Sequence, residues 1–199
     1  MSRPSMEIKA DNPITLFDRT QMPVIIQVYL EFNHLKQLFR QGWLRHGIPR
    51  DRCESVAEHS LGVAVLALLL AETYHPELDT NKVLRMALLH DFGEIYAGDI
   101  IPNDENSTSK SRLERESMLK VFEKLPNGKN YVSLWEDFES GDSREAHFVR
   151  QVDRLEMGLQ AAVYQARGYT GLGEILESAR RGLVDEEVNA LLESLEVLI

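Results

Sequence analysis

The chain has 199 residues, of which 43% are apolar and 27% charged, as in a soluble globular protein with a sizeable core. Its formal net charge of −10 argues against a nucleic-acid polymer as partner, so an anionic substrate would need a local positive centre. The single cysteine, Cys53, excludes intramolecular disulfides and multi-cysteine zinc sites and favours a reducing, cytoplasmic location.

Residues 1–23 show no clear hydrophobic periodicity and are expected to form an N-terminal arm. The remaining residues, 24–199, are expected to form a single domain. The first residues lack the pattern of a secretory signal, and the longest apolar run, over 61–71, is too short to span a bilayer. We therefore expect no membrane association.

The domain has the pattern of successive helices, because apolar residues recur at intervals of three and four along most of it. The predicted helices cover residues 24–39, 55–74, 80–91, 110–125, 143–167, 171–181 and 184–198. Ser55 followed by Glu58 is typical of a capping box at the start of the second helix. Residues 40–54 and 98–109 are predicted to be loops. No segment shows the alternation of a β-strand, so the fold class is all-α.

Polar side chains interrupt three of these apolar helices. His59 lies near the start of one helix, and His90 and Asp91 end the next. Because consecutive helices joined by a short turn usually pack antiparallel, these residues are expected to lie close together. Asp153 lies at the edge of the apolar stripe of a third helix, and Glu156 lies further inside that stripe.

Each of these residues also has a purely structural explanation. His59 could be a capping or core-edge histidine, and Asp153 could pair with a neighbouring arginine. Burying imidazole and carboxylate groups is costly without partners, so their joint occurrence favours a shared cation. The mixed nitrogen and oxygen ligands suit Mn, Co, Fe, Ni or Zn better than Ca.

The order His59, His90–Asp91 and Asp153 resembles the H…HD…D signature of the HD-domain metal-dependent phosphohydrolases. The block LLHDFGEIYAGDIIP is similar to the HD-x-x-E-x-x-x-G-D-x-x-P block of the HD-domain 5′-deoxynucleotidases. The segments ESVAEHSLGVAVLA and VDRLEMGLQA resemble the first-ligand and last-ligand helices of that family. The resemblance covers residues 25–170 and implies an HD-domain helical bundle with a metal site between buried helices.

The resemblance also implies roles for individual residues. Glu94 corresponds to the catalytic glutamate of the family, and Asp99 to the second functional acid of the same block, although Asp99 could also be a turn or cap residue. One divalent metal ion per chain (Mn, Co, Fe, Ni, Zn or Mg) is implied. Its ligands would be His59, His90, Asp91 and Asp153.

The segment before the first histidine resembles the loop in which the family carries an arginine and a tryptophan. By this resemblance Arg40 contacts the substrate phosphate, with Arg45 and Arg50 as alternatives. Trp43 would pack against the sugar and disfavour a 2′-hydroxyl; without the resemblance, Trp43 is better explained as a core residue. A homodimer is also implied.

The expected function is a 5′-deoxynucleotidase that hydrolyses deoxyribonucleoside 5′-monophosphates to deoxynucleoside and phosphate with a metal-activated water. One alternative is another HD-type phosphoesterase, acting on a different phosphomonoester or on a phosphodiester. His147 is the only histidine between Asp91 and Asp153 in the sequence. This disfavours the two-metal site of the phosphodiesterase members, which needs additional histidines there. A second alternative is a non-catalytic, nucleotide-binding regulatory module, which the presence of Glu94 and Asp99 argues against.

Overall fold

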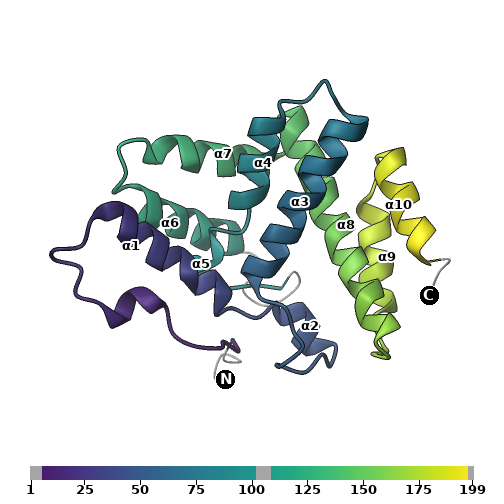
Figure 1. Cartoon of the computed structure of the whole chain (residues 1–199), viewed down its shortest axis with the longest axis horizontal. Coiled ribbons are helices and arrows are strands. Elements are labelled where there is room, and N and C mark those ends of the chain that lie inside the picture. Colours follow the sequence, from purple (N-terminus) through teal and green to yellow (C-terminus); the bar gives the residue numbers. More distant parts are fainter. Residues whose placement is uncertain (1–5, 102–108, 197–199) are drawn as a thin grey trace. The chain divides into compact units, whose positions relative to one another are not determined.

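The structure is a computed structural model that describes residues 6–101 and 109–196 (Figure 1). The regular elements are η1 (Pro13–Leu16), α1 (Val24–Phe32), η2 (Asn33–Lys36), α2 (Gln41–Arg45), α3 (Val56–Tyr74), α4 (Thr80–Leu89), α5 (Glu94–Ala97), α6 (Lys110–Phe122), α7 (Gly128–Ser140), α8 (Arg144–Ala166), α9 (Gly173–Gly182) and α10 (Glu186–Glu196). Within the described ranges the β-pairing consists of two isolated bridges, Ile8 with Leu38 and Phe39 with Ser55. The predicted all-α class is confirmed.

The chain forms two compact units. Unit 1 contains Met1–Glu58 and Leu89–Glu136, and unit 2 contains His59–Leu88 and Asp137–Ile199. Each unit combines two separate stretches of sequence. The single domain over 24–199 and the arm over 1–23 stay predictions.

Capping side chains begin the helices where the sequence indicated. The Ser55 backbone N–H donates to Glu58 Oε2 (2.7 Å), and the Glu58 N–H donates to Ser55 Oγ (3.3 Å). This reciprocal pair confirms the capping box at the start of α3. Asp79 Oδ1 accepts from the Lys82 N–H at the start of α4 (3.1 Å), and Ser143 Oγ accepts from the Ala146 N–H at the start of α8 (3.1 Å).

The helix predicted over residues 24–39 is wrong in its second half. The α-helix ends at Phe32, a 3-10 turn follows, and the chain then extends to pair with the segment before α3. The Val56 N–H donates to Leu38 O (3.0 Å), and the Arg40 N–H donates to Glu54 O (3.1 Å). These long-range bonds take backbone groups that a continued helix would use, so tertiary pairing overrides the helical periodicity.

Three segments form helices that the sequence pattern did not predict. The loop predicted over 40–54 contains the short helix α2, residues 94–97 form α5 after α4 ends at Leu89, and residues 128–140 form α7. In the loop predicted over 98–109, residues 98–101 contain no helix, and residues 102–108 lie outside the described residues.

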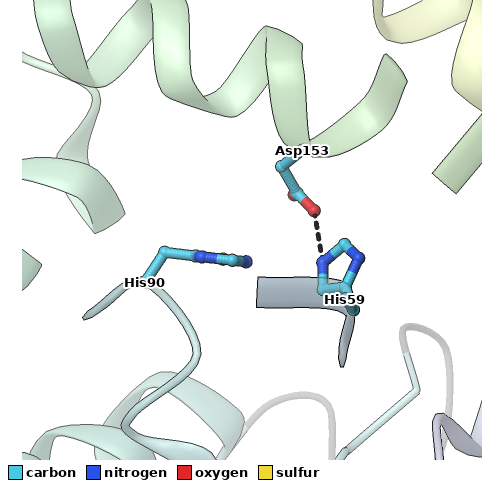
Figure 2. A group of neighbouring side chains, drawn as sticks. All are labelled: His59, His90 and Asp153. Atoms are coloured by element: carbon cyan, nitrogen blue, oxygen red, sulfur yellow. Dashed lines mark hydrogen bonds and ion pairs between the residues drawn. The ribbon is translucent and has the colours of Figure 1, made fainter. Parts of the chain in front are cut away.

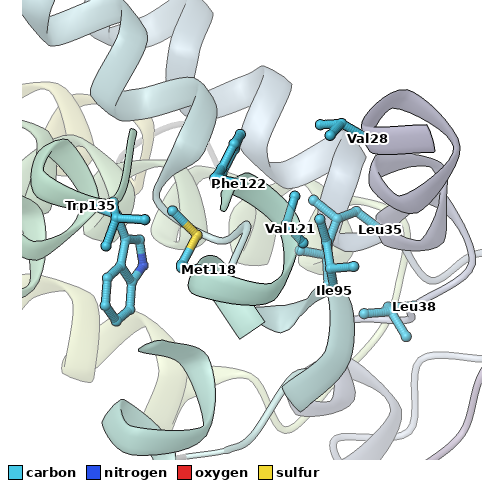
Figure 3. Close-up of a cluster of buried hydrophobic side chains, with 10 residues drawn as sticks. Val28, Leu35, Leu38, Ile95, Met118, Val121, Phe122 and Trp135 are labelled. Carbon is cyan, nitrogen blue, oxygen red and sulfur yellow. The ribbon is translucent and has the colours of Figure 1, made fainter. Parts of the chain in front are cut away.

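The core of unit 1 gathers apolar side chains from α1, η2 and α5–α7 (Figure 3). Its labelled members are Val28, Leu35, Leu38, Ile95, Met118, Val121, Phe122 and Trp135. At the edge of this cluster the Trp135 indole N–H donates to the backbone oxygen of His90 (3.0 Å). The cluster therefore fixes the backbone of the His90–Asp91 pair.

In unit 2, α8 packs along α9 and α10. Helix α3 is the other long apolar helix of this unit, and its residues from His59 onward belong to it. By length and composition alone α3, with 19 residues, could cross a membrane, and 44% of its most apolar window is buried. A core helix of a soluble protein passes the same test.

A buried ion pair in unit 1 gives a prediction about stability. The carboxylate of Glu31, 1% exposed, accepts hydrogen bonds from Lys124 Nζ (2.5 and 2.6 Å) and from the Tyr96 hydroxyl (2.8 Å). We expect Lys124→Met to lower the free energy of unfolding by about 1–3 kcal/mol, because Glu31 loses its cation and keeps one donor. Urea unfolding measures this loss.

The exposed Lys129 provides the control, since Lys129→Met should leave the unfolding midpoint unchanged. Adding Glu31→Gln to Lys124→Met should recover part of the loss, because the uncompensated charge is gone. A Lys124→Met protein as stable as the wild type would contradict the proposed importance of the pair.

Candidate active site

Unit 2 contributes His59, in the first turn of α3, and two acidic residues of α8. His59 Nε2 lies 3.0 Å from Asp153 Oδ1, and His59 Nδ1 lies 2.5 Å from Glu156 Oε2 (Figure 2 shows the contact with Asp153). Asp153 and Glu156 are three residues apart, so they share one face of α8. The His59 side chain is 1% exposed, so both of its ring nitrogens face groups inside the protein and little water reaches them.

The geometry of His59 and Asp153 fits a divalent metal ion. Two ligand atoms that each lie about 2.0–2.2 Å from one ion are separated by roughly the spacing seen here. The Glu156 carboxylate can only accept, so we assign the ring hydrogen to Nδ1, which leaves the lone pair of Nε2 directed at the side of Asp153. His59 and Asp153 belong to a group of side chains that could hold a metal ion.

Unit 1 contributes the His90–Asp91 pair, which lies in the tight turn between α4 and α5. His90 is buried, and its Nε2 lies 3.3 Å from Asp91 Oδ2. The Glu94 N–H donates to Asp91 O (3.0 Å), so the turn also sets the start of α5. His59 belongs to unit 2, so its expected proximity to His90 and Asp91 of unit 1 stays a prediction.

Arg40 lies among the acidic residues of the same unit. Its Nη1 is 3.6 Å from Asp91 Oδ2 and 3.5 Å from Asp99 Oδ1. Asp99 also accepts from the Gln41 N–H (2.5 Å), so it caps α2 as well as contacting Arg40. Of the three candidate arginines, Arg45 is exposed and Arg50 is 70% exposed in a pair with Glu7. The geometry therefore favours Arg40 for binding an anion.

Glu94 is the first residue of α5 and is 1% exposed. Both of its carboxylate oxygens are buried and accept no hydrogen bond within the described part of the chain. Burial raises its pKa well above the usual range, and the negative charges of Asp91 and Asp99 raise it further. Arg40 and Lys110 act in the opposite direction without cancelling this. A glutamate in this environment keeps its proton to higher pH, as a proton donor must.

Lys110, at the start of α6, is a residue that the sequence pattern did not connect with the site. Burial alone would lower its pKa, but the charges of Glu94 and Glu114 outweigh burial and the pKa is raised. Lys110 Nζ lies 3.5 Å from Glu114 Oε1. Gly93 permits this approach of α6, because a Cβ on Gly93 would lie 2.7 Å from Glu114 Cβ. In the sequence, the glycine inside the block HDFGE is the feature that could have indicated a closely packed neighbouring element here.

Trp43, in α2, is 3% exposed, and its indole N–H donates to Glu54 Oε1 (2.7 Å). This environment favours the explanation of Trp43 as a core residue of unit 1. The contact with a substrate sugar stays a prediction.

Comparison with known proteins identifies the family. The model of the HD domain matches residues 32–191, a span that contains His59, the His90–Asp91 pair and Asp153. The chain belongs to the HD-domain family. The HD dyad is thus His90–Asp91, at the turn between α4 and α5.

Several curated relatives of this HD-domain protein are described as 5′-deoxynucleotidases. The 5′-deoxynucleotidase HDDC2 of Homo sapiens is 35% identical over 144 residues, covering 71% of this chain and 68% of the relative. The 5′-deoxynucleotidase HDDC2 of Danio rerio is 32% identical over 179 residues, covering 87% of each chain. The predicted resemblance to this group of HD-domain phosphohydrolases is confirmed.

Solved structures share the fold of this HD-domain protein. The PH0347 protein from Pyrococcus horikoshii OT3 matches with a TM-score of 0.74 and 32% identity, over 87% of this chain and 99% of that one. A protein from Magnetospirillum magnetotacticum MS-1, described as a predicted metal-dependent phosphohydrolase, matches with a TM-score of 0.70 and 27% identity, over 86% and 89% of the two chains.

Proposed function

We propose that the chain is a metal-dependent phosphomonoesterase, and more closely a 5′-deoxynucleotidase that releases phosphate from deoxyribonucleoside 5′-monophosphates. The observation that carries this proposal is the buried Glu94 carboxyl, which accepts no hydrogen bond within the described residues and lies in the field of Asp91, Asp99 and Arg40. The site thus combines a proton donor with a cation suited to phosphate. The name shared by the relatives supports the choice of substrate.

One divalent ion per chain (Mn, Co, Fe, Ni, Zn or Mg) is part of the proposal. Two pairs of side chains would hold it: His59 with Asp153, 3.0 Å apart, and His90 with Asp91, 3.3 Å apart. The pairs come from different units, and their joint use is supported by the chain order of the ligands. When bound, such an ion supplies a water of lowered pKa and polarises the phosphoryl oxygen.

The residues of unit 1 supply the remaining steps. Arg40 binds the phosphate through its planar guanidinium, and Asp99 holds both that guanidinium and the start of α2 in place. The bond between phosphorus and the 5′-oxygen breaks as a water oxygen bonds to phosphorus. Glu94 gives its proton to the departing 5′-oxygen, which leaves as the hydroxyl of the deoxynucleoside.

The proposal extends to location and assembly: a cytoplasmic homodimer that binds no nucleic-acid polymer and no membrane. The charge of −10 supports the absence of nucleic acid. Leu61, Val65 and Leu69 lie four residues apart on α3 and are 60%, 49% and 56% exposed. This apolar face supports a protein partner that covers it.

Phosphate release from chelator-stripped protein tests the function. Deoxy- and ribonucleoside monophosphates are supplied with Mg, Mn, Co, Ni or Zn. We expect release from the deoxy compounds, weaker release from the ribo compounds and none without metal.

Other results of the same assay would contradict the proposal in distinct ways. Hydrolysis of phosphodiesters with two ions per chain would indicate another HD chemistry. Tight nucleotide binding without turnover under any metal would indicate a regulatory module. Absence of turnover and of nucleotide binding, with one ion bound per chain, would indicate that the substrate is a phosphoester other than a nucleotide.

A further inference from the structure

We propose that Glu156 is a positioning residue that fixes the ring of His59 for metal binding, and that Gly62 leaves the space that the Glu156 carboxylate needs. The inference rests on the proposed role of His59 as a metal ligand. All three residues lie in unit 2, Gly62 on α3 with His59 and Glu156 on α8.

The contact between Glu156 and His59 determines which ring nitrogen can bind a metal. A neutral imidazole carries its hydrogen on either nitrogen. Glu156 Oε2, 2.5 Å from Nδ1, accepts a hydrogen bond only if Nδ1 carries the hydrogen. The lone pair of Nε2 is then on the side of Asp153, 3.0 Å away. The side chains of Glu156 and His59 are 10% and 1% exposed, so water competes little for this bond.

Gly62 lies three residues after His59 and faces the same carboxylate. A Cβ on Gly62 would lie 2.6 Å from Glu156 Oε1, 3.1 Å from its Cγ and 3.2 Å from its Cδ. Because the one atom closer than 3.0 Å is an oxygen at the end of the Glu156 side chain, a methyl group would displace the carboxylate and leave the helix backbone in place. Alanine is also a better helix former than glycine. Gly62→Ala should therefore disturb the contact without weakening the fold.

A variant that disturbs the contact and keeps the stability of the fold can distinguish two possible roles of Glu156. If Glu156 only ties α3 to α8, variants that disturb it should lose thermal stability, and metal affinity should fall only with that loss. If Glu156 orients His59, metal affinity should fall even in a variant whose metal-free form is as stable as the wild type.

The experiment measures Co²⁺ affinity by titration calorimetry on the stripped full-length chain, together with thermal unfolding of the metal-free proteins. We expect Glu156→Ala and Gly62→Ala each to weaken Co²⁺ binding roughly 10- to 100-fold. Glu156→Gln should lose less, because its amide oxygen can still accept from Nδ1–H. Gly62→Ala should keep or raise the unfolding temperature of the metal-free protein.

Two matched controls lie in α9 of the same unit. A Cβ on Gly173 would meet nothing within 4 Å, and Glu174 is exposed, so Gly173→Ala and Glu174→Ala should bind Co²⁺ as the wild type does. Wild-type affinity in Gly62→Ala and Glu156→Ala would overturn the inference and leave the proposed metal site intact. A wild-type protein that binds no Co²⁺ would overturn the proposed metal site, and the inference with it.

Discussion

Glu94→Gln is expected to lower kcat roughly 10²- to 10⁴-fold while the protein still binds its metal ion, because glutamine has nearly the same shape but cannot donate the proton that the 5′-oxygen needs. The carboxylate of Glu94 accepts no hydrogen bond within the described residues, and burial with the nearby charges of Asp91 and Asp99 raises its pKa. Steady-state phosphate release and metal content measure the two expectations. The exposed Glu116 of α6 provides the control, since Glu116→Gln should keep its activity.

The same substitution should change the pH dependence of stability. The pKa of Glu94 in the folded protein lies above its ordinary value of 4.5, so the folded state binds more protons than the unfolded state at pH values between the two. The wild-type metal-free protein therefore loses stability as the pH rises through this interval, by up to about 1.4 kcal/mol per pH unit.

Glu94→Gln removes the titrating group and should flatten that part of the stability curve. Chemical unfolding of the metal-free proteins at several pH values measures the slope. Full turnover in Glu94→Gln would rule out Glu94 as the proton donor, whereas equal slopes would show that its pKa is not raised.

Arg40→Ala is expected to lower kcat/KM roughly 10²- to 10³-fold, the usual effect of removing a donor aimed at developing charge. Arg40 lies 3.5–3.6 Å from Asp91 and Asp99, which hold the guanidinium in one place before substrate arrives. Arg40→Lys keeps the charge but loses the planar fork, so its activity should fall between those of the wild type and Arg40→Ala.

Steady-state kinetics with competition by inorganic phosphate measure the role of Arg40. The KM and the inhibition constant of phosphate should rise together in Arg40→Ala. Arg45 is exposed, so Arg45→Ala should behave as the wild type. The opposite result, with Arg45→Ala impaired and Arg40→Ala active, would transfer the phosphate contact to Arg45.

Local sequence patterns predicted those parts of the site that depend on neighbouring residues. The capping box of α3 follows from residues within a few positions of one another, whereas the role of Glu94 rests on the family resemblance of the block around it. The preference for Arg40 over Arg45 and Arg50 as the proposed phosphate contact rests on tertiary structure, because the three differ in what lies opposite them and not in residue type.

Other features could not be predicted from the sequence because they depend on residues that are distant along the chain. The end of α1 at Phe32 depends on pairing with the segment before α3, which helical periodicity does not encode. Glu156 stood out as an acid inside an apolar stripe, but its partner is 97 positions away. The role proposed for Gly62 could be inferred only from the position of α8 beside it.

The hydrogen bond from Trp135 to the His90 carbonyl gives the chain an intrinsic optical probe. The sequence has two tryptophans, and the second, Trp43, donates its backbone N–H to Arg40 O (3.1 Å). Both indoles lie in unit 1, next to residues proposed to bind metal or phosphate. If these proposals hold, ultraviolet emission from the unlabelled protein should respond to occupancy of the site, and Trp135→Phe and Trp43→Phe would divide the signal between the HD dyad and Arg40.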